Sequence, residues 1–185
     1  MVGFNVQEKA NDLIKYGADK VYLVDNPALE RFQAEAYLSV LHNLTANYKP
    51  DILLIGSTKN EKTLAARLAT HLETGSIPDY ARLSVDEKGR LIGERITYGG
   101  NAVAKVTFRS KPQIATIPAR AFEKLEPQDR NGEVTKLDVK IEEPKTEVVE
   151  TKPLETSSVN IEEADAIVSC GRGLEKRKTR LCWRI

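Results

Sequence analysis

The spacing of apolar residues first predicts a buried strand that leads into a helix in the middle of the chain. Residues 52–55 form an apolar run with no alternation, which is typical of a strand buried on both faces of a parallel sheet. Pro50 ends the preceding helical pattern and Gly56 ends the run. Ser57 or Thr58 can then cap a helix. Its apolar positions recur at helical spacing, at Leu64, Ala65, Leu68 and Leu72.

Upstream of this unit, the pattern predicts a helix, a strand and a second helix. Asn5 and Glu8 match a capping box that opens a helix ending at Gly17. A β-rich run follows at residues 20–24, and Pro27 indicates the start of the next helix, which continues to residue 49. Alternation of strands and helices predicts an α/β fold, with a mostly parallel, Rossmann-like sheet in a three-layer α/β/α arrangement.

The pattern places no strand ahead of the first predicted helix. We therefore expect the sheet to lack one member and to expose an unpaired edge. We also expect poor solubility or partial folding of the isolated chain.

Beyond Gly75 the pattern changes to a hairpin followed by two further strands. Strands are predicted at residues 81–85 and 91–96, on either side of a turn at residues 86–89, and again at 102–108 and 113–117. Gly99 and Gly100 precede the third of these strands. A phosphate cradle is one interpretation of this pair, but no helix start follows it, so a bulge or turn is favoured.

The carboxyl end of the central strand is a candidate ligand edge, because ligands of open α/β sheets bind there. Gly56 and Ser57 occupy that position. A Gly-Ser pair after a strand is more often only a turn, so the turn is the stronger interpretation.

Charge and composition argue against several functions. Lys plus Arg (28) and Asp plus Glu (27) nearly cancel, so a nucleic-acid partner is disfavoured. No apolar run approaches the ~20 residues of a membrane span and no secretory signal opens the chain, so we expect a cytoplasmic protein without membrane insertion.

Cys170 and Cys182 lack zinc-site spacing and are expected to be reduced thiols. His42 and His71 fall on helical patterns and are interpreted as partly exposed helix residues, with no catalytic role.

The C-terminal third predicts a linker and the start of a second domain. Residues 142–160 are rich in Pro, Glu, Lys, Thr and Ser, which is typical of an extended linker. Residues 165–174 repeat the order of strand and then glycine. We expect an N-terminal domain at residues 1–140, a linker at 141–160, an incomplete second α/β domain at 161–174 and an aberrant basic tail at 175–185.

Several segments together resemble the α subunit of electron transfer flavoprotein. The similarity runs in order from about Gly3 to Leu174, so it is more specific than any one motif. The segments that carry it are Gly17 to Tyr22, Lys49 to Gly56, Tyr98 to Ala102, Arg109 to Thr116 and Ile167 to Leu174.

This resemblance implies an N-terminal domain of the nucleotide-α-hydrolase-like type followed by a domain that binds FAD. It implies an electron carrier with no substrate of its own, paired with a β subunit and served by acyl-CoA or other dehydrogenases. It also implies that Arg172 lies against the flavin, between Gly171 and Gly173. A guanidinium suits that place, because its permanent charge stabilises anionic reduced flavin or pairs with the diphosphate. Cys170 is a departure, since many members have glycine there.

The resemblance also implies that most of the FAD domain and a strand and helix upstream of Gly3 are missing, so the chain is expected to be a fragment. Two alternatives stay open: a free-standing α/β domain that binds ATP or AMP at the Gly56–Ser57 edge, and a non-functional product of a damaged gene. The basic tail is expected to be a shifted reading frame, because glutamate codons displaced by one base encode lysine and arginine. A real basic arm that docks on an acidic partner is the alternative.

Overall fold

The computed structural model describes residues 1–142, 144–146, 148–152 and 166–169. The chain divides into two compact units, residues 1–148 and 149–185. The helices and strands described below belong to the first unit. Residues 153–165 and 170–185, which include part of the predicted linker, most of the predicted second domain and the basic tail, lie outside the described residues.

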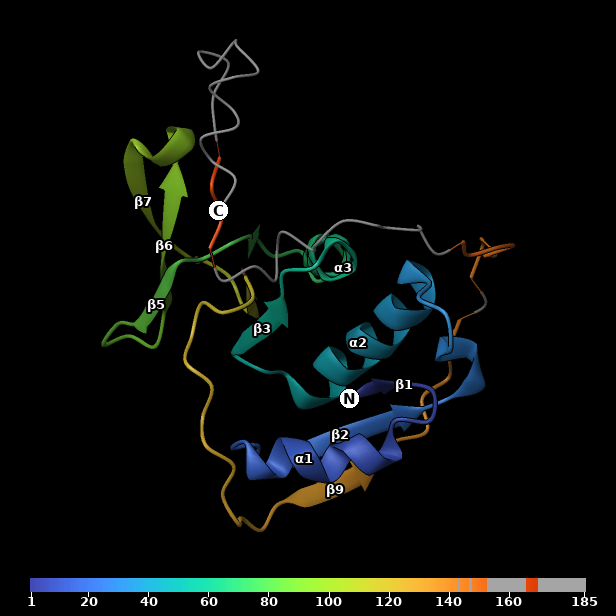
Figure 1. The fold of residues 1–185 in the computed structure, drawn as a ribbon. Helices are drawn as coiled ribbons and strands as arrows, with labels where there is room; N and C mark the ends of the chain where they lie inside the picture. Colours follow the sequence, from blue (N-terminus) through green and yellow to red (C-terminus); the bar gives the residue numbers. More distant parts are fainter. Residues whose placement is uncertain (143, 147, 153–165, 170–185) are drawn as a thin grey trace, which may run out of the picture. The chain divides into compact units, whose positions relative to one another are not determined.

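Parallel strands form two separate three-stranded sheets (Figure 1). The first has the order β1-β2-β9, with β1 at Val2–Gly3, β2 at Lys20–Asp25 and β9 at Glu133–Lys136. The second has the order β3-β8-β4, with β3 at Ile52–Gly56, β8 at Gln113–Ile117 and β4 at Ser76–Ile77. Every pairing within them is parallel. The predicted α/β class is confirmed, and the structure adds that hydrogen bonding divides the parallel strands into two groups.

An antiparallel sheet confirms the predicted hairpin and adds a third strand to it. Its order is β5-β6-β7, with β5 at Arg82–Val85, β6 at Leu91–Thr97 and β7 at Ala102–Thr107. The turn between β5 and β6 is closed by the Asp86 amide, which donates to the Arg90 carbonyl at 3.0 Å. Gly99 and Gly100 have φ values of 64° and 98° in the turn between β6 and β7, so the turn interpretation of this pair is confirmed.

Three α-helices accompany the strands in the described residues: α1 at Ala10–Lys15, α2 at Ala34–Tyr48 and α3 at Lys59–His71. Single 3-10 turns precede the first two, η1 at Gln7–Lys9 and η2 at Pro27–Leu29, and η3 spans Tyr98–Gly100. Two predicted helix ends agree with the structure. Gly17, which has φ 111°, lies two residues beyond the last residue of α1, and Lys49 is the left-handed C-cap of α2 with φ 43°.

Two predicted helix starts are wrong. Asn5 does not cap a helix: it has φ 53°, and its backbone amide donates to the Asp25 carboxylate at 2.8 Å. Pro27 opens only the single turn η2, where the Asn26 side chain accepts from the Ala28 amide at 2.9 Å. In both places a single 3-10 turn precedes the α-helix, which begins several residues later than predicted.

The prediction that no strand precedes the first helix is also wrong. Val2 and Gly3 form β1 and pair in parallel with Val24 and Asp25 of β2. A strand of two residues is too short to show a period, so its identification depends on the partner strand.

The prediction that β3 is buried on both faces is wrong, because none of the residues of β3 is fully buried. Leu53 and Ile55 pack against the core that includes Leu64 of α3, whereas Leu54 is 52% exposed. β3 is the outer strand of its sheet, and an apolar run cannot tell an outer strand from a central one.

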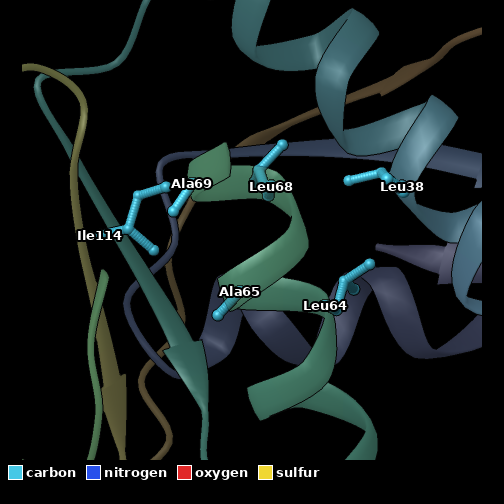
Figure 2. Close-up of a cluster of buried hydrophobic side chains, with 6 residues drawn as sticks. All are labelled: Leu38, Leu64, Ala65, Leu68, Ala69 and Ile114. Atoms are coloured by element: carbon cyan, nitrogen blue, oxygen red, sulfur yellow. The ribbon is translucent and has the colours of Figure 1, made fainter. Parts of the chain in front are cut away.

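Helix α2 packs against both parallel sheets. Leu38 belongs to a cluster that joins α2 and α3 to β8 through Ile114 (Figure 2). Val40 belongs to a second cluster, in which it packs with Val24 of β2. The remaining buried members of these clusters are Leu64, Ala65, Leu68 and Ala69 in the first and Leu29, Ala36 and Val139 in the second. On the other side of β2, α1 packs Ala10 and Ile14 against Val21.

Tyr80 joins the antiparallel sheet to the β3-β8-β4 sheet. Its side chain is fully buried with Leu91, Phe108 and Ala115, and its hydroxyl oxygen has no hydrogen-bond partner. The ring lies directly over Gly93, where an added Cβ would stand 1.6 Å from the ring carbon Cε1. The position therefore requires glycine as long as the ring keeps its place.

We expect Gly93→Ala to lower the free energy of unfolding by about 1–3 kcal/mol, because the new methyl group displaces the buried ring. Tyr80→Phe is the matched control: it keeps the ring and removes an unpaired buried hydroxyl, so stability should be unchanged or higher. Urea unfolding followed by circular dichroism measures both. A Gly93→Ala protein as stable as the parent would contradict the packing described here.

Tyr80 also predicts an alkaline dependence of stability. Burial raises its pKa from 10.0 to about 12, so the unfolded chain releases this proton first as the pH rises. The stabilisation that depends on a protonated Tyr80 hydroxyl is complete below pH 10 and is lost between pH 10 and about 12. Over that range, the stability of Tyr80→Phe should fall less steeply than that of the parent chain in urea titrations. Parallel curves would contradict this.

Candidate functional site

The candidate ligand edge lies at the carboxyl ends of β3 and β8. Gly56 is the last residue of β3 and Ser57 follows it, while Thr116 lies near the end of β8. The loop after β4 brings Asp79 to the same edge, and the first turns of α3 bring Lys62. The structure thus gathers polar side chains from four segments beside the predicted Gly56–Ser57 pair.

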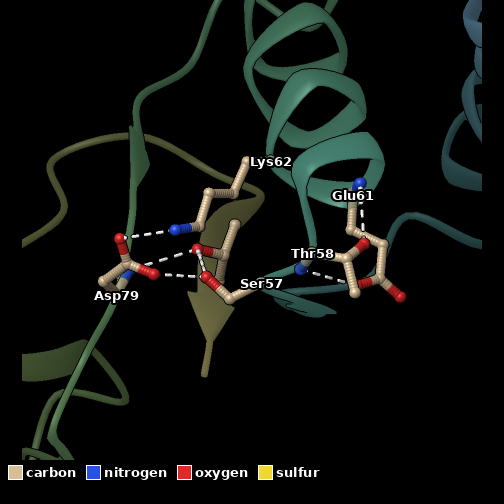
Figure 3. Close-up of polar contacts among 6 residues, drawn as sticks. Ser57, Thr58, Glu61, Lys62 and Asp79 are labelled. Carbon is tan, nitrogen blue, oxygen red and sulfur yellow. Dashed lines mark hydrogen bonds and ion pairs between the residues drawn. The ribbon is translucent and has the colours of Figure 1, made fainter. Parts of the chain in front are cut away.

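These polar side chains form a closed hydrogen-bonded network (Figure 3). The Ser57 hydroxyl donates to one carboxylate oxygen of Asp79, and the Lys62 ammonium donates to the other at 2.9 Å. The Asp79 amide donates to the Thr116 hydroxyl oxygen at 3.1 Å, and the Ser57 and Thr116 hydroxyl oxygens are 3.3 Å apart. We call these four residues, Ser57, Lys62, Asp79 and Thr116, the edge network.

Asp79 is the centre of the edge network. It has φ 57°, a left-handed conformation that aspartate tolerates better than most residues. The hydrogen bond from Lys62, followed by that from Ser57, lowers the pKa of its carboxyl group below the ordinary value of 3.8. The carboxylate is therefore fully ionised near neutral pH and is neutralised by a lysine.

A capping box fixes the start of α3 beside the network. The Thr58 hydroxyl accepts from the Glu61 amide at 3.3 Å, and the Glu61 carboxylate accepts from the Thr58 amide at 2.9 Å. The returning carboxylate lies against Gly56, where an added Cβ would be 2.4 Å from Oε2. Glycine here leaves room for the cap, so the capping role predicted for Ser57 or Thr58 is confirmed for Thr58.

The edge network suits a structural clasp better than catalysis. A serine nucleophile needs a basic partner, and an aspartate with a lowered pKa is a poor base. Lys62, the cation of the network, is already paired with Asp79. The arrangement ties the loop after β4 to the ends of β3 and β8.

The sequence pattern indicates Ser57 but none of its hydrogen-bond partners. Asp79 and Thr116 are 22 and 59 residues away from Ser57, so no local spacing connects them. Lys62 lies on the exposed side of a helical pattern, where lysine is common. Pro78 is the one sequence signal near Asp79. It indicates a turn, but it does not indicate where in the fold that turn lies.

The other candidate residues lie elsewhere. The predicted flavin residues Gly171, Arg172 and Gly173 and the thiols Cys170 and Cys182 are outside the described residues, so these predictions stay untested. His42 and His71 are exposed on α2 and α3, with ring centroids 6.1 Å apart. Among the described residues, no group of three or more His, Cys, Asp or Glu side chains is placed to hold a metal ion. In the same part of the chain, no helix has the length and apolar character needed to cross a bilayer.

Comparison with known proteins gives one consistent result. The family model for the electron transfer flavoprotein domain matches residues 2–142. The chain is 38% identical over 178 residues to electron transfer flavoprotein subunit alpha of Thermoanaerobacterium thermosaccharolyticum, covering 94% of this chain and 54% of the relative. It is 35% identical over 184 residues to the LctC subunit of lactate dehydrogenase (NAD(+),ferredoxin) of Acetobacterium woodii, covering 96% and 43%. Protein FixB of Clostridium saccharobutylicum is 35% identical over 182 residues, with 96% and 54% covered. The chain thus spans about half the length of these relatives.

We expect the Lys62–Asp79 pair to contribute modestly to stability, because both side chains are 41% exposed. A double-mutant cycle with Lys62→Met and Asp79→Asn should give a coupling energy of about 0.2–1 kcal/mol. The pKa of Asp79 is lowered in the folded state, so its contribution is present above pH 3.8 and is lost as the pH falls through the folded-state pKa. Stability of Asp79→Asn should therefore depend less on pH below 4 than that of the parent. A coupling energy of zero would contradict a stabilising role of the Lys62–Asp79 pair.

Proposed function

The chain belongs to the electron transfer flavoprotein family, and from that membership we propose that it serves electron transfer as the N-terminal part of an α-type subunit. The observation that carries the proposal is the family match over residues 2–142, together with relatives named as alpha subunits along almost the whole chain. The proposed role is that of a carrier, with no substrate of its own. The name of LctC, a subunit of a lactate dehydrogenase, is consistent with a carrier that works beside a dehydrogenase.

FAD is the proposed cofactor, and it would supply the group that accepts and releases electrons. The edge network gives no support for flavin binding in the N-terminal unit, because its charged groups are already paired with each other. Support comes instead from the sequence Gly171-Arg172-Gly173, which resembles the segment of the family that lies against the flavin. Arg172 carries a permanent charge that suits either the diphosphate or the anionic reduced flavin, and the flanking glycines allow close approach of the backbone.

A β subunit is the proposed partner, and acyl-CoA or other dehydrogenases are the proposed electron donors. The antiparallel sheet offers a surface for a protein partner: Ile96 and Val103 face each other across β6 and β7, and each is 60% exposed. Tyr98, in the turn beside them, is 84% exposed. Adjacent large apolar side chains in solvent are typical of protein interaction sites. A cytoplasmic location is part of the same proposal.

The alternative of a free-standing ATP or AMP site at Gly56 and Ser57 has weaker support. Ser57 donates to Asp79, and Lys62 is paired with the same carboxylate. A phosphate bound there would have to displace that carboxylate and break both contacts.

We expect the 185-residue chain, expressed with a β subunit of this family from the same organism, to copurify with it at equal stoichiometry. Val103→Glu should weaken this association, because it places a charge on the exposed apolar pair. Leu13→Glu on α1 is the matched control, since Leu13 is also exposed, at 41%, but lies far along the sequence on another element. Size-exclusion chromatography with light scattering measures the complex. Absence of any complex with the parent chain would contradict the proposal.

We also expect the chain expressed alone to retain no stoichiometric FAD. One arginine and two glycines cannot supply the contacts that a dinucleotide of this size needs. The visible absorbance of the purified protein measures flavin content, and free FAD removed on a desalting column is the control. A yellow protein with one flavin per chain would contradict this expectation.

A further inference from the structure

Asn131 and Gly132 lie directly before β9, at the end of the long segment that connects β8 to β9. Both residues are exposed, and neither belongs to a helix or a strand. Asn131 is the only asparagine of the sequence that precedes glycine. Neither the edge network nor the exposed apolar surface of β6 and β7 includes this pair.

An asparagine that precedes glycine is open to attack by its own backbone. The amide nitrogen of the following residue reaches the side-chain carbonyl carbon of the asparagine and closes a five-membered ring. A side chain on that following residue crowds the ring closure, and glycine has none. A hydrogen bond donated by the attacking amide also hinders the reaction, because that bond must break first.

The structure leaves both reacting groups unprotected. Within the part of the chain that the structure describes, the Gly132 amide donates no hydrogen bond, whereas the next amide, that of Glu133, donates to the Asp19 carbonyl at 3.0 Å. Among the same residues, the Asn131 side chain has no hydrogen-bond partner, although the neighbouring Arg130 has one. Ring closure therefore breaks no existing contact of either group.

Packing against α1 and β2 requires glycine at position 132. An added Cβ would stand 2.8 Å from Cγ2 of Ile14 and 3.1 Å from the Asp19 carbonyl oxygen. Ile14 is only 6% exposed and belongs to the buried cluster between α1 and β2, so it has little room to move aside. The fold thus selects at this position the residue that makes Asn131 reactive.

We propose that Asn131 is a site of spontaneous deamidation, which converts it to isoaspartate in the folded chain. The Gly132 nitrogen attacks Cγ of Asn131. A C–N bond forms there while the bond from Cγ to Nδ2 breaks, and ammonia leaves with the proton of the Gly132 amide. Water then opens the succinimide: attack at the side-chain carbonyl gives aspartate, and attack at the main-chain carbonyl gives isoaspartate. Water is the co-reactant, and no group is oxidised or reduced.

Isoaspartate changes the main chain directly before β9. The chain then runs through the former side chain and gains one backbone atom, while the former main-chain carbonyl becomes a carboxylate. The segment that must take up this atom is attached to Asp19 on both sides. The Arg130 guanidinium donates to the Asp19 carboxylate at 2.8 Å, and the Glu133 amide donates to the Asp19 carbonyl at 3.0 Å. We expect the longer chain to lose one of these two contacts.

The Arg130–Asp19 ion pair is the weaker of the two. Its side chains are 41% and 85% exposed, and exposed ion pairs contribute little to stability. The new carboxylate also lies next to Arg130 and competes for its guanidinium. We expect this pair to break and the start of β9 to fray at the Glu133 amide. The far end of β9 should stay intact, where the Leu137 amide donates to β2 at 2.8 Å.

The first test measures the rate of deamidation in the full 185-residue chain. Peptide mapping by mass spectrometry with electron-transfer fragmentation distinguishes isoaspartate from aspartate. Asn101 is the control within the same chain: it is also exposed, but it precedes Ala102, and its side-chain amide donates to the Tyr98 carbonyl at 2.8 Å. Asn131 should react faster than Asn101 by about tenfold or more, which corresponds to ~1.4 kcal/mol in activation free energy. The rate at Asn131 should rise with pH, because the attacking nitrogen must lose its proton.

The second test measures the effect on β9. Anion exchange separates the deamidated chain, because it carries one more negative charge than the parent. In its isoaspartate form, the Glu133 amide should exchange hydrogen about tenfold faster than in the fresh chain, whereas exchange of the Leu137 amide should not change. Asn131→Gln is the matched variant. It keeps a side-chain amide but would need a larger ring, so exchange at Glu133 should stay constant during incubation.

Three results would overturn the proposal. The first is an Asn131 that keeps its amide in the folded chain but reacts in the same chain unfolded by guanidinium chloride, which would mean that the fold protects it. The second is an equal rate at Asn131 and Asn101. The third is unchanged exchange at Glu133 in the purified isoaspartate form. None of these readouts depends on flavin or on a β subunit, so the proposed function can fail without affecting this inference.

Discussion

The packing of α2 against both parallel sheets is the interaction that holds the N-terminal unit together. Leu38 belongs to a cluster in which α3 lies between α2 and Ile114 of β8 (Figure 2), and Val40 belongs to a cluster with Val24 of β2. Strand hydrogen bonds cannot do this, because β1 and β3 are not paired. Since burial of one Val or Leu side chain contributes about 1.5–3 kcal/mol, a few such residues on one helix can join the two sheets.

The edge network closes the carboxyl ends of β3 and β8, where Asp79 ties the loop after β4 to Ser57 and Lys62. The other side of β3 is unpaired in this chain, because β3 is an outer strand of its sheet.

Local signals in the sequence predicted the parts of the fold that depend on neighbouring residues. The run before Gly56 and the Thr58 cap predicted β3 and the start of α3, and Gly89 predicted the β5–β6 turn, where it has φ 72°. Two strands escaped prediction because they are only two residues long, β1 and β4. The missed strand β9 is followed by alternating Leu137, Val139 and Ile141, a signal that was present in the sequence.

The candidate site was predictable only in part for the same reason. Gly56 and Ser57 could be found from the order of an apolar strand followed by glycine, but their partners come from segments that only the tertiary fold brings together. The exposure of Leu54 likewise follows from the place of β3 at the edge of a sheet, which no run of apolar residues specifies.

Residue-resolved hydrogen exchange on two α2 variants tests the central claim most directly. If α2 holds two otherwise separate sheets, Leu38→Ala should speed exchange in β3, β8 and β4 and leave β2 and β9 little changed, while Val40→Ala should do the reverse. Equal acceleration of both sheets by either variant would show that they form one cooperative sheet, and would contradict the account.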